Sequence, residues 1–251
     1  MVRLGVIVWL LAACGRENFE LDAAVDAPTI PPADHDGDGI PNAVDVCPTE
    51  FDPMQVDTDS DDVGDACDPR PTMSGDRLAG VGLFSESFGV WIPDTITNWS
   101  LGGGKVSTTS PADATAARLS FTAAGADPTV RLSFVPDDYG TSAQNHAINI
   151  LLASTTTGNW RCELRGAVDV FNQLSVYSNS TSLQQNPAGP YAAGQRLRLT
   201  INATAAGTFC GVAGISAVAV GDYTQTTMST ITFEVLGLRA SLVDAAVYTV
   251  Q

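Results

Sequence analysis

From about residue 78 to the C-terminus, apolar and polar residues alternate in short runs that are separated by turn-forming stretches such as 136–140. The alternation is clearest in Trp160–Leu164 and Arg196–Ile201. Similar runs cover residues 117–122, 129–135, 147–153, 173–177, 209–213, 230–238 and 245–250. Successive side chains of a strand point to opposite faces, so each run predicts a strand with one buried face. Many short strands without helical periodicity predict an all-β fold, an antiparallel β-sandwich over residues 78–251, which is long enough for a core of its own.

Residues 34–69 lack this alternation and carry oxygen-bearing side chains at a fixed spacing instead. In residues 34–45, called loop 1, these side chains occupy positions 1, 3, 5, 9 and 12, and Gly39 occupies position 6. With this spacing a short loop can wrap one Ca²⁺ ion in roughly six to eight oxygens. A second copy, residues 57–68 or loop 2, begins 57 − 34 = 23 residues later. Because a repeated pattern is stronger evidence than a single one, we predict about two bound Ca²⁺ ions.

The predicted ligands are the side-chain oxygens at those positions and the carbonyl oxygen at position 7. They are Asp34, Asp36, Asp38, Ile40, Asn42 and Asp45 in loop 1, and Asp57, Asp59, Asp61, Val63, Asp65 and Asp68 in loop 2. Position 6 needs a left-handed backbone, which Gly39 adopts freely and which Asp62, its counterpart in loop 2, also tolerates. Pro41, Pro48 and Pro53 argue against the flanking helices of an EF-hand. The alternative, a disordered acidic linker, gives no reason for the same spacing to occur twice.

Charge is concentrated in the same segment. The net charge is −16, and residues 1–76 hold 17 of the 28 acidic residues but only three of the 12 Lys and Arg residues. Residues 34–68 contain 12 acidic residues and no Lys or Arg. Such a segment repels itself and has little apolar surface to bury, so we expect it to fold only with bound cations. So acidic a chain is also a poor partner for nucleic acid.

Residues 34–69 resemble the thrombospondin type 3 repeat, in which an Asp-rich loop, a Cys-Pro pair, an Asn-Pro-x-Gln segment and a second loop follow one another. The corresponding segments here are 47–48, 52–55 and 64–69. The resemblance implies calcium in both loops and a disulfide between Cys47 and Cys67. Asp52 stands where Asn is usual and Asp62 where Gly is usual, and neither change removes a carboxylate.

The N-terminus predicts export. Arg3 is followed by an apolar run, Leu4–Leu11, and then by Ala12-Ala13-Cys14. This pattern resembles a bacterial lipoprotein signal over residues 1–13, which implies a lipid on Cys14 and placement at the outer membrane or cell surface. The run is too short to span a membrane; the alternative is an ordinary secretory signal. Residues 14–33 read as a flexible, proline-containing tether.

With Cys14 lipidated, four cysteines remain, an even number that suits two disulfides in an oxidising compartment. Cys162 and Cys210 both face inward in their strand patterns, and we predict that they pair. The strand order and the closing segment, 233–250, resemble the laminin G and concanavalin A-like jelly roll, a fold whose members commonly bind sugars or calcium.

Catalysis is not expected from the predicted strands. Glycosidases with this fold use two neighbouring carboxylates, whereas Glu163, Asp169 and Glu234 are isolated in the sequence. His146 is the only histidine of the sandwich and reads as structural.

Unlike catalysis, ligand binding is compatible with the sequence, and two functions remain. Asp137, Asp138 and Asn145 offer oxygens for an ion at the rim, but a plain solvated turn is the better explanation of these residues. Five aromatic residues offer a face for stacking on sugar rings or fill the core: Trp91, Trp99, Trp160, Tyr139 and Tyr191. The first function is an adhesion or carbohydrate-binding lipoprotein whose repeat is a calcium-stiffened stalk. The second is a structural surface protein whose sandwich only packs with a protein partner.

Overall fold

The computed structural model describes residues 33–251 except 85–86, 110–115, 140–145, 155–157, 167–169, 180, 205–206, 213–214 and 221–227. The predicted signal, the lipidated Cys14 and the tether up to residue 32 lie outside these residues, as do Asn145 and Asp169. Within them no helix is long and apolar enough to cross a membrane. The one helix described is the short 3-10 turn η1 (Ile96–Asn98).

Fifteen strands make up the rest of the described secondary structure. They are β1 (Asp76–Leu83), β2 (Ile92–Pro93), β3 (Trp99–Gly102), β4 (Lys105–Thr108), β5 (Ala117–Ala124), β6 (Ala126–Asp138), β7 (His146–Ser154), β8 (Gly158–Gly166), β9 (Phe171–Ser178), β10 (Thr181–Tyr191), β11 (Leu197–Thr204), β12 (Gly207–Val212), β13 (Ile215–Val220), β14 (Met228–Leu236) and β15 (Arg239–Val250).

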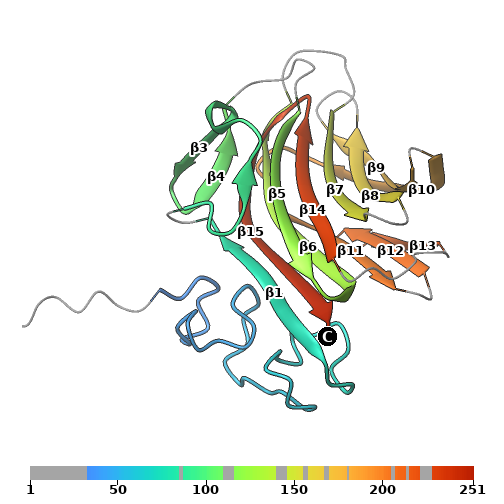
Figure 1. Cartoon of the computed structure of the whole chain (residues 1–251). Helices are drawn as coiled ribbons and strands as arrows, with labels where there is room; N and C mark the ends of the chain where they lie inside the picture. The colour runs from blue at the N-terminus through green and yellow to red at the C-terminus, as the bar shows by residue number, and fades with distance from the viewer. Residues whose placement is uncertain are drawn as a thin grey trace, which may run out of the picture. The chain divides into compact units, whose positions relative to one another are not determined.

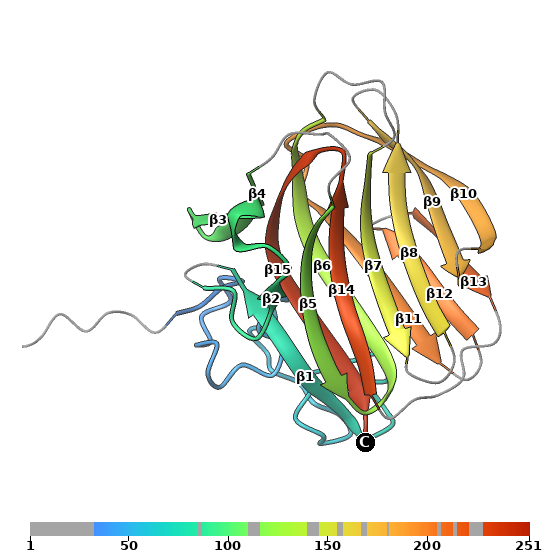
Figure 2. The ribbon, with the colours of Figure 1, turned by 45° about the horizontal axis from the view of Figure 1, so that its top comes forward.

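The strands form two sheets that face each other (Figures 1 and 2). Sheet A has eight strands in the order β13-β12-β11-β6-β15-β4-β3, with β1 also paired to β15. Sheet B has seven, in the order β10-β9-β8-β7-β14-β5-β2. Every described pairing is antiparallel, for example β14 with β7 and β15 with β6. The predicted all-β antiparallel sandwich is confirmed.

The inward-facing residues of the two sheets form one core. In β11, Leu197, Leu199 and Ile201 are almost fully buried while the residues between them are partly exposed, which is the predicted alternation. Cys162 of β8 and Cys210 of β12 form a disulfide, so a buried covalent bond joins sheet B to sheet A. The closing strand β15 lies between β6 and β4 in the middle of sheet A.

The structure corrects two details of the strand prediction. The stretch read as a turn at 136–140 begins inside β6, which continues to Asp138 because Pro136 and its neighbours pair with β15. The sandwich begins at Asp76 rather than at residue 78, because β1 pairs from Asp76 onward with the end of β15.

The five aromatic residues considered for sugar stacking belong to the core instead. Trp91, Trp99, Trp160, Tyr139 and Tyr191 are each at most 6% exposed. Trp91 stacks on Phe233, with ring centroids 4.2 Å apart. Such large apolar side chains contribute more to stability when they are buried than when they are left in water.

Candidate functional site

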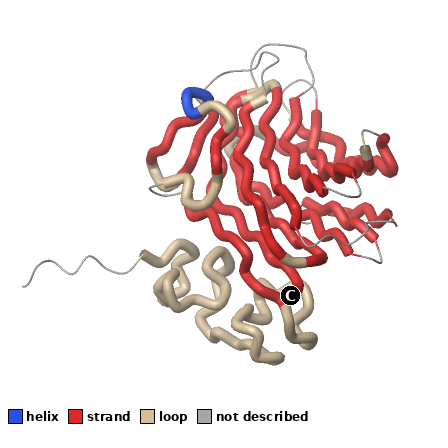
Figure 3. The backbone as a smooth tube through the Cα atoms, in the orientation of Figure 1, coloured by secondary structure: helices blue, strands red, loops and turns tan. Residues whose placement is uncertain are grey.

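The two calcium loops lie in residues 33–75, a segment without helix or strand in the structure (Figure 3). Their backbones follow the same path. Position 4 has a positive φ in both loops, 80° at Gly37 and 64° at Ser60. Position 6 does too, 94° at Gly39 and 71° at Asp62. Asp62 therefore adopts the left-handed conformation that was expected of it.

The same hydrogen bonds shape both loops. At position 1, Asp34 accepts the N–H groups of residues 37 and 39 at 2.8 and 2.9 Å. Asp57 accepts those of residues 60 and 62 at 2.7 and 3.0 Å. At position 5, Asp38 accepts the N–H of Ile40 at 2.7 Å, and Asp61 that of Val63 at 3.1 Å. Carboxylates that bond the loop backbone in this way are drawn toward the loop centre.

The structure brings the first three acidic positions of each loop together. Carboxylate oxygens of Asp34, Asp36 and Asp38 lie within 4.8 Å of one another, and the same holds for Asp57, Asp59 and Asp61. This is close enough for one cation to contact all three groups of a loop, since Ca²⁺ takes oxygen ligands at roughly 2.3–2.6 Å.

Several carboxylate oxygens in these loops are buried without a hydrogen-bond partner. They are Oδ2 of Asp36, Asp45, Asp52 and Asp68 and both oxygens of Asp59. Four of these five residues hold positions 3 and 12, and they do so in both loops. Because a buried charge without a partner is costly, the pattern fits a bound cation.

The raised pKa values of two loop carboxylates also fit a bound cation. Burial, with the charges of Asp38 and Asp45, raises the pKa of Asp36 from 3.8 to about 6. Burial, with the charges of Asp76 and Asp61, raises the pKa of Asp68 to about 6. In the described residues neither carboxylate forms an ion pair within 4.0 Å, and a divalent cation would neutralise the charge at both positions.

The side chains at position 9 are engaged within their loops. Asn42 Oδ1 accepts the N–H of His35 at 2.9 Å. Asp65 accepts the N–H of Thr58 at 2.8 Å and its hydroxyl at 2.6 Å. These bonds draw each loop closed between positions 2 and 9. The roles of all twelve predicted groups as calcium ligands, the carbonyls of Ile40 and Val63 included, stay predictions.

A disulfide between Cys47 and Cys67 joins the two halves of the repeat. Both cysteines are fully buried, and a side chain at Gly64 would overlap Cys47, because its Cβ would lie 2.9 Å from Cys47 Sγ. The disulfide packs on Tyr248 and Ala246 of β15. The small core of the repeat is therefore completed by the sandwich.

Polar contacts attach the repeat to the outer face of sheet A. Arg131 of β6 donates to the carbonyl of Cys67 at 2.7 Å. Arg198 of β11 pairs with Glu50 and donates to the carbonyl of Thr49 at 3.2 Å. Residues 33–251 form one compact unit. In the described residues the repeat is thus a cover on sheet A, whereas a stalk would hold the sandwich at a distance.

The outer face of sheet B carries polar side chains that line up across five strands. Strand register places Arg118 of β5, Glu234 of β14, Asn149 of β7, Glu163 of β8 and Ser175 of β9 opposite one another. We call this set the polar row. All of its side chains except that of Ser175 are bonded to each other or to near neighbours: Arg118 Nε donates to Glu234 at 2.6 Å, and Asn149 Nδ2 donates to Glu234 at 2.9 Å.

Beside the polar row, Arg161 of β8 lies over the ring of Tyr177, with its guanidinium carbon 4.0 Å from the ring centroid. The Tyr177 hydroxyl donates to Glu163 at 2.9 Å. Three atoms at this face are buried without a hydrogen-bond partner: Asn149 Oδ1, Ser175 Oγ and Arg161 Nε. In Figure 2, no described strand lies in front of β14, β7 and β8. Asn149 and Ser175 are fully buried, whereas the Arg118 and Arg161 side chains are 47% and 30% exposed, so the arginines are the groups of this face that a polar ligand would meet first.

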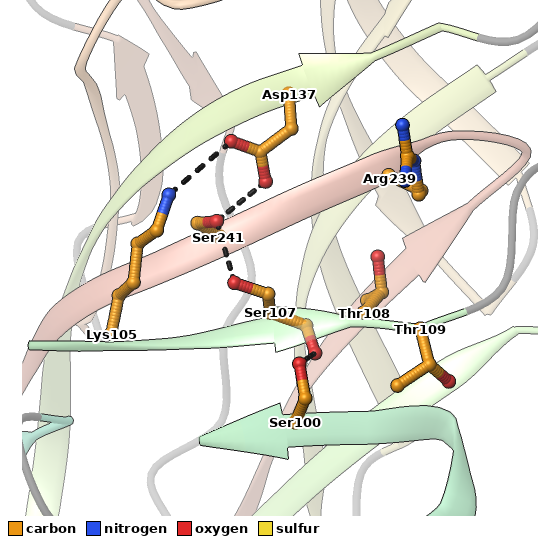
Figure 4. Close-up of a pocket in the computed structure, with 8 residues that line it drawn as sticks. All are labelled: Ser100, Lys105, Ser107, Thr108, Thr109, Asp137, Arg239 and Ser241. Atoms are coloured by element: carbon orange, nitrogen blue, oxygen red, sulfur yellow. Dashed lines mark hydrogen bonds and ion pairs between the residues drawn. The ribbon is translucent and has the colours of Figure 1, made fainter. Parts of the chain in front are cut away.

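A separate pocket of about 390 Å³ lies where β3, β4, β6 and β15 meet (Figure 4). It is lined by Ser100, Lys105, Ser107, Thr108, Thr109, Asp137, Arg239 and Ser241. Asp137 pairs with Lys105 at 3.5 Å and accepts a hydrogen bond from Ser241. Asp138 pairs with Arg239 at 2.9 Å. The two acids considered for a rim ion are therefore paired with cations.

Sequence reasoning missed the polar row because its members are far apart along the chain. Asn149 and Glu234 are 85 residues apart and become neighbours only through the register of β7 and β14. The outward-facing Arg161 and Glu163 in the alternating run 160–164 were the available signal. His146 is buried beside Tyr139 and Phe171, and its Nε2 lies 3.1 Å from the carbonyl of Val170, which fits a structural role.

A family model described as "Thrombospondin type 3 repeat" matches residues 32–55, which include all of loop 1. A comparison with curated protein sequences finds no match. The match thus covers the first part of the repeat recognised from its motifs, and loop 2 lies beyond it.

Solved structures resemble the sandwich. A seed lectin of Lotus tetragonolobus is 9% identical, with a TM-score of 0.54 over 69% of this chain and 99% of its own. A β-glucanase of Bacillus licheniformis is 13% identical, with a TM-score of 0.52 over 70% and 99%. The exoplasmic/lumenal domain of VIP36 in its Ca²⁺/Man3GlcNAc-bound form is 10% identical, with a TM-score of 0.51 over 70% and 90%. At these identities the likeness shows the fold, and the chain carries a thrombospondin type 3 repeat beside a concanavalin A-like sandwich.

Proposed function

We propose that this protein binds carbohydrate through the outer face of sheet B, while calcium held by loops 1 and 2 orders the repeat over sheet A. The observation that carries the sugar site is the polar row across five strands, with the partly exposed Arg161 beside it. Sugar hydroxyls both donate and accept hydrogen bonds, so a ring lying along the row can bond the exposed guanidinium groups of Arg118 and Arg161. The lectins that share the fold support this choice.

Hydrolysis is a weaker fit to the same residues. Glu163 and Glu234 share one face and are separated by one strand, β7. Glu234 pairs with Arg118, and Glu163 lies 3.6 Å from Arg161 and 3.9 Å from Arg165. A glycoside hydrolase needs two carboxyl groups that are free to act on the bond to be cleaved, whereas both of these carboxylates are held by guanidinium groups.

A glycan array on the full chain, with calcium and with EDTA, tests the proposal. Arg161→Ala should weaken the binding of the best glycan about ten-fold or more, because it removes the stacked guanidinium and its donors. Arg239→Ala is the matched control, since it removes an arginine at the pocket of Figure 4. If only Arg239→Ala weakens binding, the pocket is the site instead.

Two further outcomes decide against this function. Release of reducing ends from a bound glycan, lost in Glu163→Gln or Glu234→Gln, would assign a hydrolase. No binding to any glycan would favour the alternative, a structural surface protein that packs with a protein partner.

We also propose that Cys14 carries a lipid and holds the protein at the outer membrane or cell surface, where adhesion would be its role. The lipoprotein-like signal before Cys14 motivates this. Incorporation of labelled fatty acid in bacteria expressing the gene, and its loss in Cys14→Ser, is the expected result. Secretion of an unmodified chain would instead indicate an ordinary signal peptide.

A further inference from the structure

Asp76 lies outside both calcium loops, yet its carboxylate joins the residues of loop 2. Asp76 is the first residue of β1 and is 5% exposed. Carboxylate oxygens of Asp61, Asp68 and Asp76 lie within 4.8 Å of one another. Asp61 and Asp68 hold positions 5 and 12 of loop 2, so the third group is contributed by the sandwich and not by the repeat.

Backbone hydrogen bonds hold Asp76 beside Asp61 of loop 2. Asp61 Oδ2 accepts the N–H of Gly75 at 3.0 Å and that of Asp76 at 2.7 Å. On its other side Asp76 is paired with Val250, at the end of β15. Loop 1 makes a similar link, in which Asp38 Oδ2 accepts the N–H of Asp52 at 3.1 Å. Asp76 is therefore held beside loop 2 by the same kind of bond that closes loop 1.

The charges at this point do not balance. Arg70 is the one cation paired with the three carboxylates in the described residues, and its Nε lies 2.9 Å from Asp76 Oδ2. Asp68 is 7% exposed, and its Oδ2 is buried with no hydrogen-bond partner. Three carboxylates, two of them buried, and one guanidinium leave two negative charges, which a divalent cation would neutralise.

We infer that Asp76 is a ligand of the calcium ion of loop 2, shared with Asp61 and Asp68. The ion then binds the repeat and the first strand of the sandwich at once. Calcium would hold the cover on sheet A directly, in addition to ordering the loop. This inference uses the calcium function proposed above and is independent of what sheet B binds.

Calorimetric titration of the full chain with Ca²⁺ tests the inference. Asp76→Asn keeps the shape of the side chain and removes its charge, and it should weaken one of the two sites about ten-fold or more, leaving the other unchanged. Asp62→Asn is the matched control, because it removes one charge from the exposed position 6 of the same loop and should change neither site more than about two-fold.

Thermal unfolding followed by Trp fluorescence gives a second measurement, because Trp91, Trp99 and Trp160 lie in the sandwich and the repeat has no tryptophan. Calcium should raise the midpoint of the wild type and of Asp62→Asn by a similar amount, and that of Asp76→Asn by less. Each variant is compared with itself in the presence and absence of calcium, so the test also holds for a variant that is less stable than the wild type without calcium.

Other outcomes overturn the inference. If Asp68 and Asp76 share a proton instead, Asp76→Asn will leave both calcium sites unchanged. If Arg70 supplies the whole counter-charge, Arg70→Gln will lower stability equally with calcium and with EDTA, and Asp76→Asn will not alter calcium binding. A wild type that takes up no calcium would refute the calcium function itself.

Discussion

The two outer faces of the sandwich carry similar side chains but meet different surroundings. On sheet A, Arg131 and Arg198 reach carbonyl groups and Glu50 of the repeat. On sheet B, Arg161 lies over a tyrosine of its own sheet, and its Nε has no hydrogen-bond partner. The arginines of the first face find partners in the repeat, although the Tyr248 hydroxyl there has none, whereas no described segment outside sheet B bonds Arg161.

This difference separates a structural surface from a candidate binding surface. Burial of polar groups is common to both faces and identifies neither. The distinguishing property is whether partners are present, because buried polar groups in folded proteins nearly always have them. The cover over sheet A explains its arginines, whereas no described segment plays that part for sheet B.

Removing calcium should have the largest effect on the difference between the two faces. If each loop binds Ca²⁺ with a dissociation constant near 10⁻⁴ M, 10 mM calcium stabilises the fold by about 2.7 kcal/mol per site and about 5 kcal/mol in all. EDTA should therefore release the cover and increase hydrogen exchange in β1, β6 and β15 more than in β7, β8 and β14. Equal protection with and without calcium would contradict the cover.

The two disulfides should have separable effects. Replacing Cys47 and Cys67 by Ala opens a loop of 20 residues and should cost about 3 kcal/mol, together with weaker calcium binding. Replacing Cys162 and Cys210 opens a loop of 48 residues and should cost about 4 kcal/mol. Denaturant titration and calcium titration of both pairs provide the check. An equal loss of calcium affinity in the two double variants would show that calcium binding by the loops depends on the stability of the whole fold.

The smallest effect should come from single arginines. Arg198→Ala should destabilise the calcium-loaded protein by about 1–3 kcal/mol, because it leaves partly buried partners in the repeat unpaired. In EDTA most of this cost should vanish, since the cover is already released. Arg118→Ala on sheet B, whose arginine side chain is 47% exposed, should cost about 1 kcal/mol or less in both conditions. Calcium dependence of the Arg118 variant would contradict the assignment of the two faces.

Local patterns predicted those features that depend on neighbouring residues. The two-residue alternation predicted the strands and the inward positions of Cys162 and Cys210, which the structure joins. The repeated spacing of oxygen-bearing side chains predicted loops whose backbones prove to match at positions 4 and 6. Each signal is confined to a dozen residues or fewer, so the sequence displays it directly.

Features that depend on long-range register were not predictable in the same way. Arg131 and Arg198 look like ordinary outward-facing strand residues, and nothing near them signals a cover formed by residues 49–67. Asp76 read as the end of an acidic segment, and its role depends on the pairing of β1 with β15. The stretch 136–138 looked like a turn, but pairing with β15 outweighs its turn propensity.

Tyr248 gives the protein a natural optical probe. Its ring packs with the Cys47–Cys67 disulfide and lies 5.2 Å from the Arg131 guanidinium, and it is 1% exposed. Burial raises the pKa of its phenol above 10. A phenol returned to water would ionise at lower pH and absorb ultraviolet light at longer wavelength. Release of the repeat from sheet A would expose Tyr248 and could then be followed by the ultraviolet absorbance of unlabelled protein. The Tyr248→Phe variant gives the background signal.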